Sequence, residues 1–165
     1  MGKSALTAER LREVLRYEPE TGLWLWVVSR GGTKIGAVAG TPHDGYVRIK
    51  IDGCLYLAHR LAWFWMTGEW PEFEVDHEDL DRANNRWKNL RHATDSQNRA
   101  NTKAFSNNKS GFKGVSWHAR IGKWMVSISV NRKKTHLGYF DCPAAGSFAY
   151  QIEADKAFGE FARSS

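Results

Sequence analysis

A short polar segment divides this sequence and thereby limits what it can fold into. Residues 106–111 read Ser-Asn-Asn-Lys-Ser-Gly, which are small and polar residues typical of a linker or loop. The chain has 165 residues, of which 42% are hydrophobic, an ordinary share for a globular protein. The sequence therefore predicts two small cores rather than one, with domains at 1–105 and 112–165 joined by this linker.

The first half predicts short elements between closely spaced turns. Thr7 is the expected N-cap of a helix over 8–17. Glycines and two Asp-Gly pairs then break the chain into short pieces. The elements expected between these turns are strands at 22–28, 35–39, 46–51 and 54–57 and an apolar helix at 59–66.

The second half predicts a minimal α+β module. Three strands are expected at 112–117, 123–130 and 135–139, followed by a helix from 143 to about 161. A preceding helix over 94–103, with Thr94 as N-cap, is expected to close the first domain. The apolar stripe that should face the sheet from the last helix consists of Ala145, Phe148, Ala149, Ile152, Ala157 and Phe161.

Charge is distributed unevenly along the chain. The net charge is +6 and the pI is about 9.4, which favours a polyanionic partner such as nucleic acid. Residues 96–140 hold nine Lys and Arg and no Asp or Glu, so the rest of the chain sums to −3. Residues 69–81 hold seven carboxylates. An acidic segment beside a basic one suits an enzyme that holds a cation next to a phosphate backbone, whereas each run alone would be read as a solvated face.

Cysteine content and hydropathy exclude several classes of protein. Cys54 and Cys142 cannot form a disulfide framework or a four-thiolate zinc site, so we expect a reduced intracellular, cytoplasmic location. The longest apolar run, at about 61–66, is far shorter than the roughly 20 residues of a membrane span. No secretory signal is recognisable at the start of the sequence.

Side chains suited to metal-dependent hydrolysis gather between residues 75 and 98. Asn89 and Asn98 lie 13 and 22 residues after Asp76, which directly precedes His77. A neutral imidazole with a pKa of about 6.5 can accept a proton from water at neutral pH, which suits His77 as a general base. Oxygen ligands such as those of Asp76 and Asn98 suit Mg²⁺. Because neighbouring strand residues point to opposite faces, the strand must end or bend at His77 for the pair to share one site.

The stretch Val75-Asp76-His77, Asn84 to Arg91 and Gln97-Asn98 resembles the HNH endonucleases, most closely their phage and intron-encoded branch. The resemblance implies a ββα-metal fold and a homing-type, metal-dependent DNA endonuclease that hydrolyses phosphodiester bonds. It implies His77 as the catalytic base, Asn89 as a catalytic-site residue that ties the loop to the second strand, and Asp76 and Asn98 as ligands of one Mg²⁺ or Mn²⁺. Leu80 stands where relatives often have glycine. The preceding Ala58-His59-Arg60-Leu61 also resembles this family, with His59 or Arg60 either touching DNA or making structural hydrogen bonds.

The second half carries basic charge interleaved with aromatic residues on one small sheet, which is typical of DNA binding. The segments Ser110 to Trp117, Gly122-Lys123-Trp124 and His136 to Asp141 resemble the AP2 DNA-binding domain, which lays its sheet in the DNA major groove. Trp124 is expected to pack between sheet and helix. The predicted DNA-binding residues are Lys113, Trp117, Arg120, Lys123, Arg132, Lys133, Lys134 and His136.

The sequence therefore predicts an α+β chain in which an HNH nuclease domain precedes an AP2-like module. The expected partner is double-stranded DNA, with no membrane and no small-molecule cofactor. A monomer is expected and a dimer is the alternative. A non-catalytic DNA-binding regulator on a decayed nuclease scaffold is the competing function. The target sequence and the choice between nicking and double-strand cleavage stay open.

Overall fold

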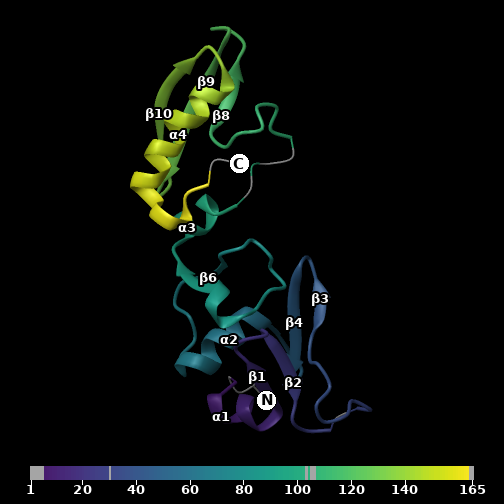
Figure 1. Cartoon of the computed structure of the whole chain (residues 1–165). Helices are drawn as coiled ribbons and strands as arrows, with labels where there is room; N and C mark the ends of the chain where they lie inside the picture. The colour runs from purple at the N-terminus through teal and green to yellow at the C-terminus, as the bar shows by residue number, and fades with distance from the viewer. Residues whose placement is uncertain (1–5, 30, 103, 105–106, 164–165) are drawn as a thin grey trace. The chain divides into compact units, whose positions relative to one another are not determined.

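The computed structural model describes residues 6–29, 31–102, 104 and 107–163. These residues form four α-helices and several small antiparallel sheets, a mixed α/β architecture (Figure 1). The chain divides into two compact units, Met1–His92 and Ala93–Ser165. Residue 106, the first residue of the linker predicted at 106–111, lies outside the described residues. The predicted domain limits stay predictions.

The described residues of the first unit form two α-helices and three small sheets. Strands β1 and β2 pair as a hairpin, β3, β4 and β5 form a second sheet, and β6 pairs with β7. The bounds are α1 Ala8–Val14, β1 Leu15–Glu18, β2 Leu23–Trp26, β3 Thr41–His43, β4 Tyr46–Ile51, β5 Cys54–Leu57, α2 Ala58–Thr67, β6 Glu74–His77, a 3₁₀ turn Trp87–Asn89 and β7 Leu90–Ala93.

Two predictions for the first unit are wrong. The expected helix over 8–17 ends at Val14, because Leu15–Glu18 instead pairs with Leu23–Trp26 as β1 and buries Leu15 and Tyr17. The expected strand at 35–39 is reduced to an isolated bridge between Leu25 and Val38 among the described residues. Positive φ angles at Gly36 and Gly40 prevent a continuous extended strand there.

The core of the first unit fixes the strands that lead to the predicted site. Side chains from α1, β1, β2, β4 and α2 meet in one cluster, whose fully buried members include Leu11, Leu15, Trp24, Ile49 and Leu61. Val75 of β6 and Leu90 of β7 belong to the same cluster. Burial of these two residues anchors both strands, so that Asp76 and His77 project from a packed scaffold.

The second unit contains a three-stranded sheet with strand order β10-β9-β8 and a long helix against one face (Figure 1). This confirms the predicted three strands and helix, with shifted ends. The bounds are α3 Asp95–Ala100, β8 Val115–His118, β9 Lys123–Val130, β10 Lys133–Phe140, α4 Pro143–Phe158 and a 3₁₀ turn Gly159–Phe161. Val115, Val126 and Ile128 are buried beneath α4.

The buried face of α4 differs from the predicted stripe. Phe148 is 71% exposed and Ile152 is 41% exposed, whereas Tyr150, Ala154 and Phe158 are buried. Helix and sheet approach closely, because a Cβ added to Gly146 would lie only 2.8 Å from Cγ2 of Val126. Close packing at Gly146 therefore turns this side of α4, with Tyr150, Ala154 and Phe158, towards the sheet, and Phe148 and Ile152 point outward.

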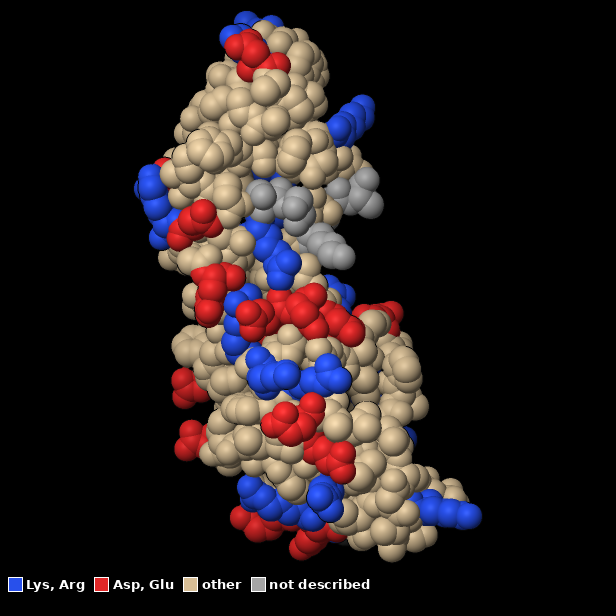
Figure 2. Space-filling view, in the orientation of Figure 1, with Lys and Arg blue, Asp and Glu red and all other residues tan. Residues whose placement is uncertain are grey.

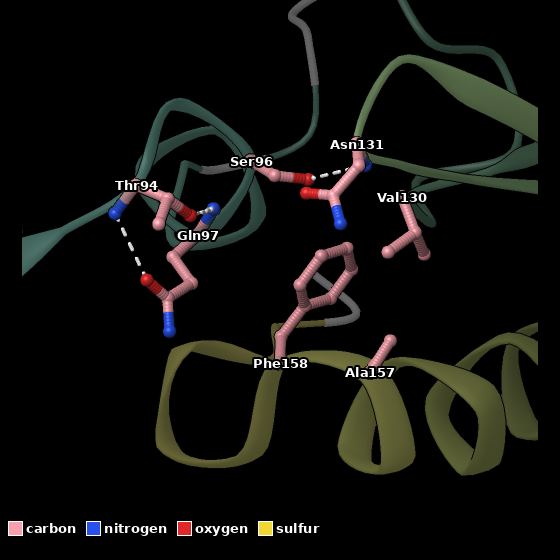
Figure 3. Close-up of a pocket in the computed structure, with 7 residues that line it drawn as sticks. All are labelled: Thr94, Ser96, Gln97, Val130, Asn131, Ala157 and Phe158. Atoms are coloured by element: carbon pink, nitrogen blue, oxygen red, sulfur yellow. Dashed lines mark hydrogen bonds between the residues drawn. The ribbon is translucent and has the colours of Figure 1, made fainter.

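Helix α3 packs within the second unit and not in a separate domain. Ala93, two residues before the helix, and Ala100, its last residue, belong to the second hydrophobic cluster. Ser96 Oγ accepts a 3.0 Å hydrogen bond from the Asn131 amide (Figure 3). Its start is a capping box between Thr94 and Gln97, as the sequence predicts for this N-cap. A pocket lies between α3, the β9–β10 turn and the end of α4, and is lined by Thr94, Ser96, Gln97, Val130, Asn131, Ala157 and Phe158 (Figure 3).

None of the helices in the described part of the chain is both long and apolar enough to cross a membrane.

Candidate active site

Asp76 and His77 are the last two residues of β6, and both are buried. The strand ends at His77, where the Leu80 amide donates to the His77 carbonyl and the chain turns. Asp76 Oδ2 accepts a 3.1 Å charge-assisted bond from Arg91 Nε on β7. Their side chains are only 7% and 14% exposed, so each charge compensates the other in a poorly solvated place.

Asn85 orients the His77 ring. His77 Nε2 lies 3.4 Å from Asn85 Oδ1, a long hydrogen bond. The Asn85 amide nitrogen donates to the Ala83 carbonyl, so its oxygen is the atom that faces the imidazole. Nε2 is therefore the protonated nitrogen in the neutral ring, which makes Nδ1 the basic one. Burial lowers the pKa of His77 below its ordinary value despite the opposing effects of Asn85 and Asp76, so the ring is neutral at pH 7.

The loop after His77 is held by its own polar side chains. Asn89 Oδ1 accepts from the Asp79 amide at 3.1 Å, and its nitrogen donates to Asp79 Oδ1 at 2.9 Å and to the Asn84 carbonyl at 2.8 Å. The backbone also joins here, because the Glu78 amide donates to the Asn89 carbonyl. Asn89 thus ties the loop to the start of β7.

The carboxylates of Asp79 and Asp81 also hold this loop in place. Burial acts to raise the pKa of Asp79, but hydrogen bonds from Asn84, the Asp81 amide and Asn89 outweigh it and lower that pKa. Asp81 accepts from the Ala83 amide at 2.9 Å. Leu80 has φ +67°, so the position where relatives often have glycine does adopt a left-handed backbone here.

The rings of His59 and Tyr46 lie beside His77. The His59 ring on α2 meets it edge to face at 4.9 Å between centroids, and Tyr46 at the start of β4 lies 6.1 Å away. Burial, with smaller effects from His77 and Arg60, lowers the pKa of His59 to about 3, so this ring is neutral too. Arg60 donates to the carbonyls of Pro71 and Phe73, at 3.1 and 3.5 Å. These contacts support structural hydrogen bonding by Arg60 rather than contact with DNA.

Asp76, His77 and Asn89 thus lie in the first unit. Asn98 lies on α3 in the second unit, where its main-chain amide donates to the Thr94 carbonyl. Carboxylate and amide oxygens are hard ligands of the kind that Mg²⁺ takes. The described residues contain no group of three or more His, Cys, Asp or Glu side chains that could hold a metal ion.

Sequence reasoning missed the partners of these residues. Asn85 and Arg91 stand within the stretch that carries the HNH resemblance, but the sequence predicts no role for them. The ion pair could have been predicted from charge complementarity between two neighbouring strands. Asp76 lies on one of these strands and Arg91 on the other. The Asn85 contact depends on the path of the loop, for which the sequence carries no comparable signal.

The predicted DNA-binding residues have different environments in the second unit. Lys113 Nζ donates to the Ala100 and Arg99 carbonyls, at 2.5 and 3.3 Å, so it caps the C-terminal end of α3. Burial, with the charge of Arg163, lowers the pKa of Lys113 to about 8. Lys123 pairs with Asp141 at 3.0 Å, and Arg132 pairs with Asp95 at 3.5 Å across exposed surface.

The strand register separates the remaining residues by face. Lys134 pairs with Ser129 and His136 with Ser127, one residue out of phase with the buried Val126 and Ile128. They therefore point to the side of the sheet opposite α4. Trp117 and Trp124 share the register of Val115 and Val126, on the α4 side.

Trp124 packs on the hydrophobic core of the second unit, as predicted. Trp117 is 52% exposed, and its ring meets the Trp124 ring edge to face. Arg120 lies in the β8–β9 turn, and Lys133 begins β10.

Charged side chains are visible on both units in Figure 2. Acidic and basic groups alternate over the first unit, whereas the visible face of the second unit is mostly uncharged. On that face the basic residues do not form one continuous patch.

A protein-family model described as HNH endonuclease matches residues 56–100. The match begins in β5, includes α2, β6 and β7, and ends with α3, so it contains Asp76, His77, Asn89 and Asn98. Residues 56–100 are an HNH endonuclease domain. HNH nucleases act on DNA and generally use a divalent metal ion. No curated protein and no solved structure matches the chain.

Proposed function

We propose that this protein is a metal-dependent endonuclease that hydrolyses phosphodiester bonds of double-stranded DNA. The observation that carries the proposal is the buried, neutral His77 beside Asp76, inside the HNH domain and oriented by Asn85. A neutral imidazole with a basic Nδ1 can take the proton of an attacking water.

Each residue has a separate role in this proposal. His77 is the general base, and Asn89 holds the loop that carries Asn85 and Asp79. Asp76 and Asn98 hold one Mg²⁺ or Mn²⁺, as the HNH resemblance implies. Such an ion, when bound, neutralises charge on the scissile phosphate and the leaving oxygen. Arg91 on β7 holds the Asp76 carboxylate in place through the 3.1 Å ion pair.

We also propose that the second unit binds DNA as an AP2-like module in a homing-type enzyme of phage or bacterial origin. Its three-stranded sheet with a helix on one face supports this assignment, and Lys134 and His136 on the open face and Arg120 in a turn are suited to contact DNA. The capping role of Lys113 makes it the weakest of the predicted contacts. We expect the protein to act as a monomer inside the cell. A monomer with one active site would nick one DNA strand at a time.

The test of catalysis uses supercoiled plasmid with Mg²⁺ or Mn²⁺ and three proteins. Wild type is expected to convert the plasmid to nicked or linear forms, and EDTA or His77→Ala should abolish this. His43→Ala is the matched control, because His43 is exposed on β3 and its loss should leave cleavage intact. Cleavage by His77→Ala, or none by wild type with any metal and DNA tried, would contradict the proposal. DNA binding without cleavage would favour the non-catalytic regulator instead.

The test of the second unit uses the full chain with Arg120→Ala and Lys134→Ala combined. Each lost phosphate contact should lower the slope of log affinity against log salt by about one. Glu153→Ala and Asp155→Ala on α4 form a charge-changing control on the other side of the sheet. Unchanged affinity and slope in the Arg120/Lys134 variant would contradict DNA binding by the open face.

A further inference from the structure

Arg82, in the loop that follows His77, lies over an aromatic ring of the β3–β4 hairpin. The Arg82 guanidinium carbon lies 4.9 Å from the centroid of the Tyr46 ring, in cation–π geometry. Its aliphatic stem crosses the hairpin turn, because a Cβ added to Gly45 would lie 3.6 Å from Cδ of Arg82. Ring and turn together restrict a long side chain that would otherwise move freely.

The same ring borders the predicted catalytic base. The Tyr46 centroid lies 6.1 Å from that of His77 and 5.3 Å from that of His59. Tyr46 is therefore a neighbour of both the Arg82 guanidinium and the predicted base.

The charge of Arg82 is not used within the fold. Arg82 is exposed and makes no ion pair or side-chain hydrogen bond to any other described residue. The nearby carboxylates have other partners: Asp79 binds Asn84 and Asn89, Asp81 binds the Ala83 amide, and Asp44 faces His43 and Arg48. The carboxylates of Asp79 and Asp81 are thus bonded within the loop, and neither pairs with the Arg82 guanidinium.

We propose that Arg82, positioned by Tyr46, binds a backbone phosphate of the DNA strand that is cleaved at His77. This inference rests on the proposed nuclease function. A guanidinium stacked on a ring keeps its N–H edge available, and its planar fork matches two phosphate oxygens. Stacking also restricts the side chain before DNA arrives, so less conformational entropy is lost on binding. Arg82 and Tyr46 therefore form a phosphate-binding pair at the edge of the active site.

The experiment compares variants of the full chain in two assays. Single-turnover cleavage at saturating protein should fall about tenfold or more in Arg82→Ala and less in Arg82→Lys, which keeps the charge without the fork. Tyr46→Leu should lose a similar factor, and Tyr46→Phe should recover most of it because the ring face remains. DNA affinity measured in EDTA should show a salt slope lower by about one in Arg82→Ala.

Arg86→Ala is the matched control, because it removes the same charge from an exposed residue four positions away. Equal losses in Arg86→Ala and Arg82→Ala would overturn the inference and assign the effect to net charge. Wild-type rates and salt slope in Arg82→Ala would overturn it as well. Absence of cleavage by wild type would contradict the nuclease itself, and the salt slope would still decide whether Arg82 binds phosphate. Circular dichroism and melting of each variant identify any loss of folding at Tyr46.

Discussion

Asn89→Ala should open the loop that follows His77. The change removes three hydrogen bonds, two to Asp79 and one to the Asn84 carbonyl. Each is worth about 1 kcal/mol net, and Asp79 is exposed enough for water to replace part of the loss. We therefore expect the free energy of local loop opening to fall by about 2–3 kcal/mol, which corresponds to an opening constant raised about 30- to 150-fold.

Amide hydrogen exchange measures this directly. The Asp79 amide donates to the Asn89 side chain and should exchange faster by about that factor in Asn89→Ala. The Glu78 amide is an internal control, because it donates to the Asn89 main-chain carbonyl, which alanine retains. Cleavage should fall in parallel, since Asn85 belongs to the same loop and orients His77.

Two results would refute the reasoning. Unchanged exchange at Asp79 would mean that the side chain of Asn89 does not hold the loop. Equal acceleration at Glu78 and Asp79 would mean that the variant unfolds more than the loop. A normal exchange pattern with lost cleavage would give Asn89 a direct catalytic role instead of a structural one.

Three other predictions concern pH and backbone geometry. Because burial lowers the pKa of His59 to about 3, its protonation favours the unfolded chain, so stability should fall as pH drops from about 6.5 towards 3, by at most about 1.4 kcal/mol per unit. Urea unfolding of His59→Phe should show a weaker dependence over that range, and identical curves would contradict the assignment. Burial also lowers the pKa of His77, so the cleavage rate should be flat near neutrality and fall in acid with a midpoint below about 6.5; a midpoint above that value would argue against this base. Gly22→Ala should destabilise the first unit by about 2 kcal/mol or more, since φ is +75° and the new Cβ would lie 2.5 Å from the Arg86 amide nitrogen. An unchanged melting temperature would disprove this prediction.

Local patterns predicted much of the secondary structure. The capping box at Thr94, the helix that ends at Gly68 and the two strands of the β9–β10 hairpin depend on residues close in sequence. The end of β6 at His77 follows from the turn formers after it. Each of these features involves contacts over a few residues, so the sequence alone contains the relevant information.

Choices between competing partners could not be predicted in this way. Leu15 and Tyr17 fit a helical pattern but form β1, because pairing with β2 buries them and satisfies their backbone groups. Phe148 fits the apolar stripe of α4 but is exposed, since close packing at Gly146 selects another face. Propensity is a weak preference, and long-range packing overrides it.

The same division applies to the candidate site. By itself the sequence determined that Asp76, His77, Asn89 and Asn98 occur at the spacing of an HNH domain, because that spacing is a property of the chain. Only the tertiary structure decided what these side chains contact: Arg91 for Asp76, Asn85 for His77, and the Tyr46 ring for Arg82. Those contacts join residues from different strands and loops, and their geometry depends on how the elements pack.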